Sequence, residues 1–227
     1  MIYVLFLFIA VLSAAALSVF GARMGVIDFG DKLPLYRPAA AESEIRPYKG
    51  IKLALIIMIC FAALAAIQVS LYTNTSLINF VKIYGVGVIV VAAAVVDSKR
   101  RIIPNLLILT GLAFRLLLYG WELISKTEMK GILINDLIGL LLGFGLLALV
   151  SLLTKGALGL GDAKLFGIIG ITCGVYCTYS TLLISLVVSV VVSVVGMIMK
   201  KMTRKDAFPF GPCIAVGYLL TILLKSY

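Results

Sequence analysis

Three aspartates lie at the edges of long apolar runs of this chain: Asp97, Asp136 and Asp162. An aspartate at the centre of a membrane helix costs about 2.5 to 3.5 kcal/mol even on lenient insertion scales, so each is a candidate functional group. Two carboxylates held close together cannot both ionise easily, and they share a proton. One can then act as general base on a water molecule while its protonated partner donates a hydrogen bond to a carbonyl under attack. The alternative is that each aspartate caps a helix or pairs with a neighbouring cation.

Glycines cluster immediately before Asp162. Gly156, Gly159 and Gly161 all fall within the six residues that precede it. Such a backbone can adopt positive φ and lets another chain approach closely. A peptide must be extended to be cut, and extended backbone at membrane depth needs main-chain hydrogen-bond partners, which an unwound glycine segment supplies. An ordinary loop or a close helix crossing would also use glycine. The glycines therefore indicate a peptide-binding site only in combination with Asp162.

The composition defines the class of protein. Of the 227 residues, 63% are hydrophobic and 13% are charged, whereas charged residues approach a quarter of an ordinary soluble domain. The continuously apolar runs favour membrane helices over a β-barrel, whose strands would be about ten residues long with alternating polarity. We therefore expect an all-α, polytopic transmembrane helical bundle of about eight helices. The predicted spans are residues 2–20, 51–71, 79–96, 104–121, 132–153, 163–178, 179–199 and 209–224.

Positive charge sets the expected orientation of these spans. Lys and Arg concentrate in the connections at 23–52, 98–103, 155–164 and 200–205, whereas the connection at 72–78 has none. By the positive-inside rule the basic connections are cytoplasmic and both termini lie outside. Asp97 and Asp162 then share the cytoplasmic face, and Asp136 lies near the outer end of the fifth span.

The net charge of +10 is mostly a consequence of this topology. The charges are spread over separate short loops, which gives little support to nucleic-acid binding. We interpret the first span as an uncleaved anchor, because it lacks a basic stretch before it. The alternative is a cleaved secretory signal.

Cysteine and histidine usage argues against a metal site. The chain has no histidine, no CxxC pair, and four cysteines that all lie in apolar runs. The sequence therefore predicts neither a zinc site nor a disulfide framework. We expect the cysteines to be small packing residues. They are Cys60, Cys173, Cys177 and Cys213.

Three motifs between residues 97 and 217 resemble those of the type IV prepilin peptidases, membrane aspartic proteases of the GxGD class. Family members carry an Asp before a basic stretch and Ile-Pro-Asn, then Gly-x-Gly-Asp-x-Lys, then a Pro-Phe-Gly-Pro-like segment. All three occur here in that order. They are "DSKRRIIPN" from Asp97 to Asn105, "GLGDAK" from Gly159 to Lys164, and "FPFGPCIAVG" from Phe208 to Gly217.

The resemblance implies a membrane aspartic endopeptidase. It would remove the leader peptide from type IV prepilins or pseudopilins at the cytoplasmic face of the cytoplasmic membrane, with Asp97 and Asp162 as the catalytic pair. Its partners would be the substrate and the lipid membrane. The implied division is residues 1–78, N-terminal helices with a short cytoplasmic loop, and residues 79–227, a six-helix peptidase core. The residues implied to bind substrate or support the dyad are Pro104, Asn105, Gly159, Gly161, Lys164, Pro209, Phe210, Gly211 and Pro212.

One departure from the family bears on cofactors. Many bacterial members also N-methylate the new terminus, and they carry two zinc-binding CxxC pairs in a large cytoplasmic region after the first helix. Here residues 21–50 span only 30 positions and contain no cysteine. We therefore expect a peptidase that has no zinc-binding insert and uses neither zinc nor S-adenosylmethionine. A bifunctional peptidase/N-methyltransferase is the alternative.

Two rivals come from other functional classes. A proton-coupled membrane transporter would also combine intramembrane acids with glycine breaks. Such carriers bind near the midplane and often show two similar halves, whereas Asp97 and Asp162 are expected at the cytoplasmic boundary and the chain has no convincing repeat. A scaffold or proton pathway in a secretion assembly would leave one of the two aspartates dispensable.

The remaining polar and small residues inside the spans have structural interpretations. Arg115 lies within the fourth span and needs a partner or a route to water. Asn135 and Asp136 are expected to cap the start of the fifth helix. Close helix packing is expected at the glycines of the same span, Gly139, Gly143 and Gly145.

Overall fold

The structure is a computed structural model that describes residues 27–28, 48–49, 76–125, 128–154, 159–199 and 209–224. The chain divides into two compact units, Met1–Ser76 and Leu77–Tyr227. In the first unit, β1 (Ile27–Asp28) pairs in parallel with β2 (Tyr48–Lys49). The spans predicted at 2–20 and 51–71 lie outside the described residues, as do Cys60 and Gly156.

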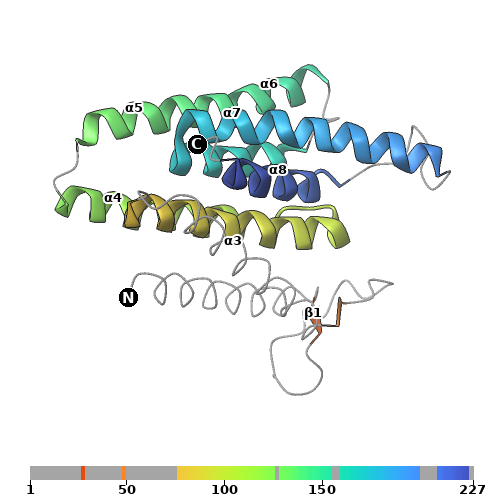
Figure 1. Ribbon diagram of the computed structural model, residues 1–227, viewed down its shortest axis with the longest axis horizontal. Coiled ribbons are helices and arrows are strands. Elements are labelled where there is room, and N and C mark those ends of the chain that lie inside the picture. Colours follow the sequence, from red (N-terminus) through yellow and green to blue (C-terminus); the bar gives the residue numbers. More distant parts are fainter. Residues whose placement is uncertain are drawn as a thin grey trace. The chain divides into compact units, whose positions relative to one another are not determined.

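The second unit is helical throughout its described residues, as the apolar runs predicted (Figure 1). Within the described residues, four stretches are long and apolar enough to cross a membrane: Leu77–Ser98, Asn105–Ile124, Met129–Leu153 and Leu160–Ile198. The last helix is shorter. The total of about eight helices stays a prediction. The elements are α3 (Leu77–Arg100), α4 (Asn105–Ile124), α5 (Met129–Leu140), a π-helical turn η1 (Leu141–Gly145), α6 (Leu146–Leu153), α7 (Leu160–Ile198) and α8 (Gly211–Leu223).

Helix α7 is broken at Gly174, where φ is 82° and ψ is −174°. Positive φ is readily available to glycine and to few other residues. The backbone oxygen of Phe166 and the side chain of Thr178 both lie within 3.0 Å of a Cβ built on Gly143. In an unbroken helix these two residues would be about 18 Å apart. The chain therefore doubles back at Gly174, as Figure 1 shows.

The two arms of α7 run in opposite directions beside α8. In the first arm, Phe166 stacks on Phe210 with ring centroids 6.5 Å apart. Further along it, the Cys173 Sγ lies 3.5 Å from the Tyr218 hydroxyl, so the first arm is parallel to α8. In the second arm the order is reversed. The Thr181 hydroxyl donates to that of Thr221 at 3.2 Å, and the later residue Ser185 packs against the earlier residue Gly217. The second arm is therefore antiparallel to α8.

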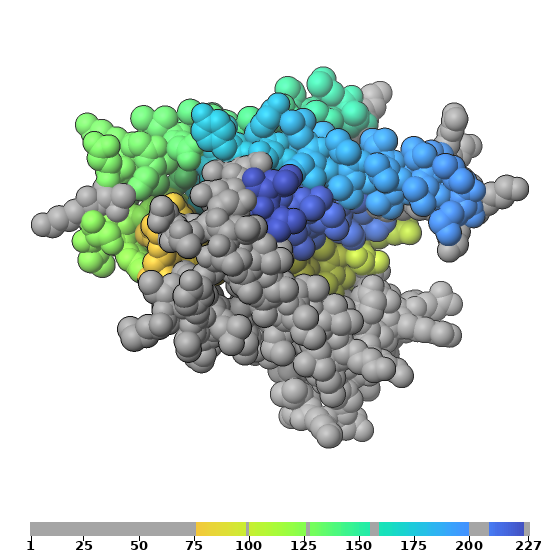
Figure 2. Space-filling view, viewed as in Figure 1, coloured from red at the N-terminus to blue at the C-terminus, as the bar shows by residue number. Residues whose placement is uncertain are grey.

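This hairpin accounts for the spans predicted at 163–178 and 179–199. The chain does reverse between two helical segments, but the turn lies at Gly174 and not between residues 178 and 179. The apolar sequence continues through the break, so hydrophobicity alone does not locate it. On the face seen in Figure 2, the second arm of α7 lies at the surface with large apolar side chains exposed, as expected of a lipid-facing helix.

Glycines let α5 and α7 approach closely, as the sequence predicted for Gly139 and Gly143. A Cβ on Gly139 would lie 2.4 Å from the backbone oxygen of Gly170, and one on Gly143 would lie 2.4 Å from that of Phe166. Close backbone approach of this kind lets membrane helices pack by van der Waals contact. Gly145 takes no part, because its Cβ position has no neighbour within 4 Å.

Helix α3 ends and α4 begins within five residues. Arg101 adopts a positive φ of 52°, which stops α3, and its N–H donates to the Asp97 carbonyl at 2.8 Å. A left-handed residue other than glycine costs roughly 1 to 2 kcal/mol. Pro104 is the N-cap of α4 in an extended conformation, φ −66° and ψ 137°. This tight corner fixes the last turn of α3, which carries Asp97, beside the start of α4.

Candidate active site

Four helix ends meet at one end of the second unit: the end of α3 and the starts of α4, α7 and α8. The Gly211 N–H donates to the Asp97 carboxylate, which joins α8 to α3. A Cβ on Gly161 would lie 3.2 Å from the Ile103 Cβ, which places α7 against the corner before α4. The three motifs that resemble those of the prepilin peptidases therefore come together in space.

Asp97 lies in the last turn of α3 with only 6% of its surface exposed. Its Oδ2 accepts the N–H of Gly211 at 2.9 Å. Gly211 is the first residue of α8, so the carboxylate also faces the positive end of that helix. A Cβ on Gly211 would lie 2.8 Å from both the Cβ and the Oδ2 of Asp97. Only glycine therefore fits between the backbone of α8 and this carboxylate.

Asp162 lies in the first turn of α7, whose N-cap is Gly159. Its N–H donates to the Gly159 carbonyl at 3.1 Å, closing that turn. Its side chain is half-buried and lies within electrostatic range of Asp97. The structure thus brings together two carboxylates that are 65 positions apart in the chain.

The glycines before Asp162 do not have the backbone conformation expected from the sequence. Among the described glycines, positive φ occurs at Gly174, whereas Gly159 has φ −66° and ψ 128° and Gly161 is helical. Their small size matters instead. A Cβ on Gly159 would lie 3.1 Å from the Asp162 Oδ2, and one on Gly161 would crowd Ile103. The positive φ that the sequence allowed is therefore not adopted at either residue, and Gly161 is wound into α7, whereas Gly159 is extended.

The other predicted site residues lie on the rim of the aspartate pair. The Lys164 ammonium donates to the Asn105 side-chain oxygen at 3.1 Å, which ties the start of α7 to the start of α4. Both side chains are exposed. Pro209, Phe210 and Pro212 flank Gly211 and are half-buried.

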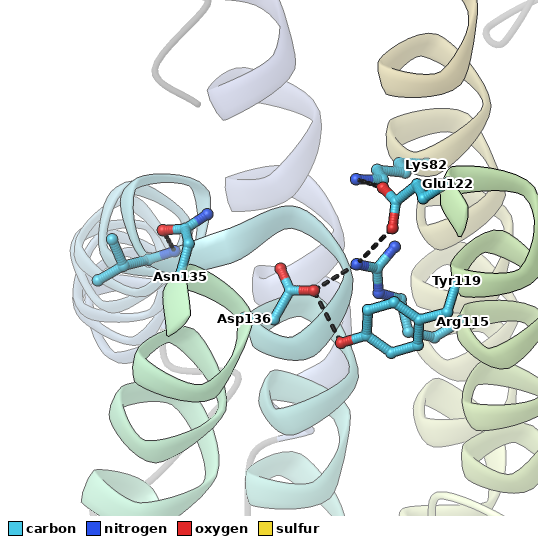
Figure 3. Close-up of polar contacts among 7 residues, drawn as sticks. Lys82, Arg115, Tyr119, Glu122, Asn135 and Asp136 are labelled. Carbon is cyan, nitrogen blue, oxygen red and sulfur yellow. Dashed lines mark hydrogen bonds and ion pairs between the residues drawn. The ribbon is translucent and has the colours of Figure 1, made fainter. Parts of the chain in front are cut away.

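A second charged cluster joins α3, α4 and α5, and its pairing was not predicted from the sequence (Figure 3). Arg115 pairs with Asp136 and lies 3.2 Å from the Glu122 carboxylate, and Glu122 also pairs with Lys82. The Tyr119 hydroxyl donates to Asp136 at 2.8 Å. Arg115, Glu122 and Asp136 are each at most 3% exposed. The expectation that Arg115 needs a partner is met by Asp136.

Asn135 and Asp136 do not cap the start of α5, contrary to the prediction. Helix α5 begins at Met129 with Glu128 as its N-cap, so both residues lie inside the helix. Asp136 faces Arg115, and the Asn135 Oδ1 accepts the N–H of Val175 at 3.3 Å. Asn135 therefore supports the second arm of α7 just after its break. The pairing of Asp136 could have been predicted from Arg115, because a buried cation in a neighbouring span needs an acidic partner.

Fold and site define a membrane protein whose second unit is helical in its described residues, with two carboxylates at one end of that unit and a balanced ion cluster farther along its helices. Comparison with known proteins is consistent with this class. Residues 84–194 match the type IV leader peptidase family. The matched segment contains both Asp97 and Asp162.

Two curated relatives are similar over 60% of the chain. One is the prepilin leader peptidase/N-methyltransferase of Bacillus subtilis, 28% identical over 135 residues, or 52% of its length. The other is the type 4 prepilin-like proteins leader peptide-processing enzyme of Escherichia coli O78:H11, 27% identical over 139 residues, or 49% of its length. The chain thus matches about half the length of these relatives. No solved structure matches it significantly.

Proposed function

We propose that this protein is a membrane aspartic endopeptidase that removes the leader peptide from type IV prepilins or pseudopilins. One observation carries the proposal. The Asp97 carboxylate, held by the Gly211 N–H, lies within electrostatic range of Asp162 inside a family match that spans both residues. A pair of neighbouring carboxylates can activate water and polarise a carbonyl without any other group.

The surroundings of the pair support peptide hydrolysis. The glycines of two motifs, Gly159 and Gly211, place no side-chain atoms against the two carboxylates. The Lys164–Asn105 hydrogen bond holds the starts of two helices together at the rim of the site. We propose that these residues, with Gly161, Pro104 and the segment from Pro209 to Pro212, shape the substrate site.

The proposed location is the cytoplasmic membrane with the site facing the cytoplasm. The basic connections adjoining Asp97 and Asp162 support this orientation by the positive-inside rule. A prepilin-type substrate would meet the site where its leader joins its hydrophobic helix.

Cleavage is proposed to need neither zinc nor S-adenosylmethionine. The carboxylate pair supplies both the base and the acid of the reaction. The Bacillus subtilis relative is named as an N-methyltransferase as well as a peptidase, but residues 21–50 of this chain carry no cysteine for the zinc-binding insert. Treatment of the purified protein with a metal chelator is expected to leave the cleavage rate unchanged.

The test is cleavage of a prepilin-type substrate in membranes by the wild type, Asp97→Asn and Asp162→Asn. The new N-terminus and the mass shift identify the product. Each variant is expected to insert normally and to lose cleavage. If either variant cuts at a rate comparable to that of the wild type, the two-aspartate mechanism is wrong, and a transporter or scaffold role becomes the better explanation.

A further inference from the structure

The two aspartates of the site have unequal surroundings. Asp97 accepts a backbone N–H at 2.9 Å from the first residue of α8. Among the described residues, the Asp162 side chain has no hydrogen-bond or ion-pair partner, although its backbone N–H donates to the Gly159 carbonyl at the start of α7. The two carboxylates therefore differ in hydrogen bonding, because only Asp97 has a donor among the described residues, the Gly211 N–H.

This contact favours negative charge on Asp97. A backbone N–H at a helix N-terminus forms a stronger hydrogen bond with a carboxylate than with a neutral carboxylic acid. The partial positive charge of the α8 terminus acts in the same direction. Negative charge on Asp97 in turn makes ionisation of its neighbour Asp162 less favourable, so a single shared proton is placed on Asp162.

We propose that Gly211 is a positioning residue that assigns the two chemical roles, with Asp97 as the ionised general base and Asp162 as the protonated general acid. The assignment rests on the proposed peptidase function and adds a direction to it. Gly211 acts only through Asp97, because its N–H is already engaged by that carboxylate and its missing side chain leaves the carboxylate in place.

The reaction then follows one course. Asp97 removes a proton from water as the water oxygen bonds to the scissile carbonyl carbon, while Asp162 gives its proton to the carbonyl oxygen. The product is a neutral gem-diol with Asp97 protonated and Asp162 ionised. Asp97 next gives its proton to the peptide nitrogen as the C–N bond breaks, and Asp162 takes a proton from one hydroxyl. The amine and the acid leave, and both aspartates regain their starting states.

Few other charges act on Asp97 from the described residues. Arg101, which follows α3, and Asp162 on α7 lie within electrostatic range of it. Lys164 on α7 is hydrogen-bonded to Asn105 of α4. The described part of α8 beside Asp97 carries no charged side chain. The Gly211 contact is therefore the feature of α8 that acts on the charge of this carboxylate.

The first test compares Gly211→Ala with Gly217→Ala. Both substitutions crowd α8, since a Cβ on Gly217 would lie 2.2 Å from the Ser185 Oγ, but Gly217 lies away from Asp97. Displacing the Gly211 N–H removes a donor that favours ionised Asp97. The acidic limb of the pH–kcat profile is therefore expected to move to higher pH, by about one unit. In Gly217→Ala the limb stays in place even if less protein is folded. Equal limbs in the two variants would overturn the role of Gly211.

The second test needs no substrate and no change at Gly211. Infrared difference spectra of purified protein near neutral pH report the carbonyl band of a protonated carboxyl group. We expect this band to be lost in Asp162→Asn. In Asp97→Asn we expect it to persist to a higher pH than in Asp162→Asn, although removal of the Asp97 charge makes Asp162 easier to ionise than in the wild type. Loss in Asp97→Asn alone, or the same behaviour in both variants, would contradict the assignment. If the wild type cuts no prepilin, the proposed function fails, while the spectra still decide which aspartate carries the proton.

Discussion

The two charged clusters of this protein involve opposite ends of helix α3 and differ in how their charges are arranged. Lys82 and Asp97 are both on α3, 15 residues apart, which corresponds to about 22 Å along the helix. Near Lys82, two cations face two anions. Near Asp97, two carboxylates lie within electrostatic range of each other, and among the described residues the Gly211 N–H donates the hydrogen bond that the pair accepts.

The difference indicates what each cluster does. Buried charges that are paired satisfy one another, and their removal is felt by the fold. Like charges held together destabilise one another and are retained where their protonation is useful. The Arg115 cluster is thus expected to hold helices α3, α4 and α5 together, and the aspartate pair to carry out chemistry. Substitutions at the two ends should therefore affect different properties of the protein.

The largest expected effect on activity is at the aspartate pair. Asp97→Asn or Asp162→Asn should lower kcat by at least about 10³-fold, because residues that act as a unit fail together. The double variant should be no worse than either single one. Thermal unfolding in detergent should be unchanged or shifted upward, since each substitution removes one of two buried carboxyl groups that cannot both ionise easily. A clear drop in thermal stability would mean that the pair is structural.

The largest expected effect on stability is at Arg115. Arg115→Leu leaves Asp136 buried without its cation and should lower the free energy of unfolding by about 3 to 5 kcal/mol. Lys130→Leu is the matched control, because Lys130 is exposed and has no ion pair among the described contacts, and it should change stability by less than about 0.5 kcal/mol. Thermal or denaturant unfolding in detergent measures both. Equal stability of the two variants would show that the cluster does not hold the helices.

Removing both members of the Arg115–Asp136 pair sharpens the same point. Arg115→Leu with Asp136→Leu leaves Lys82 paired with Glu122 and adds apolar surface. Replacement of a buried ion pair by apolar residues is often close to neutral, so the double variant should recover most of the stability lost in Arg115→Leu. It should also cut substrate at a rate near that of the wild type per folded molecule. A stability loss equal to the sum of the single losses would contradict a pairwise interaction.

A smaller effect is expected where glycines join α5 to α7 between the two clusters. Gly139→Ala introduces a Cβ 2.4 Å from a backbone oxygen, and overpacking of this kind costs about 1 to 3 kcal/mol. Gly145→Ala, in open space on the same segment, should be neutral or stabilising by about 0.5 to 1 kcal/mol. Unfolding of the two variants under identical conditions provides the comparison. A Gly139→Ala protein as stable as Gly145→Ala would contradict the close approach of the two helices.

Sequence reasoning found what depends on composition and order. The apolar runs located the helices between residues 77 and 224, and the alternation of basic connections placed Asp97 and Asp162 on one side. The sequence did not predict features that depend on which residues come into contact in the folded protein. Gly159 and Gly161 have negative φ, and their role is to leave space for neighbouring atoms. A sequence pattern cannot distinguish a glycine needed for its small size from one needed for positive φ. The break at Gly174 was placed a few residues away, since Cys173 and Val175 read as one continuous apolar run.

The ion cluster illustrates the same limit. Arg115 and Asp136 could each be recognised as a charge inside an apolar run, but their pairing needs the relative rotation of α4 and α5. That rotation follows from side-chain packing, which hydrophobicity does not encode. Asp136 was therefore predicted to cap the fifth span, although the helix begins at Met129.

The break at Gly174 also has a consequence for the depth of the site. The first arm of α7 runs from Leu160 to Cys173 and is about 21 Å long, and α8, with 13 residues, is about 20 Å long. Both begin beside the aspartate pair, and both are shorter than a hydrocarbon layer of about 30 Å. If their far ends approach the opposite surface of the membrane, their first turns lie below the level of the headgroups. Hydrolysis would then take place in a recess within the bilayer, and water would have to reach the two carboxylates between the shortened helices.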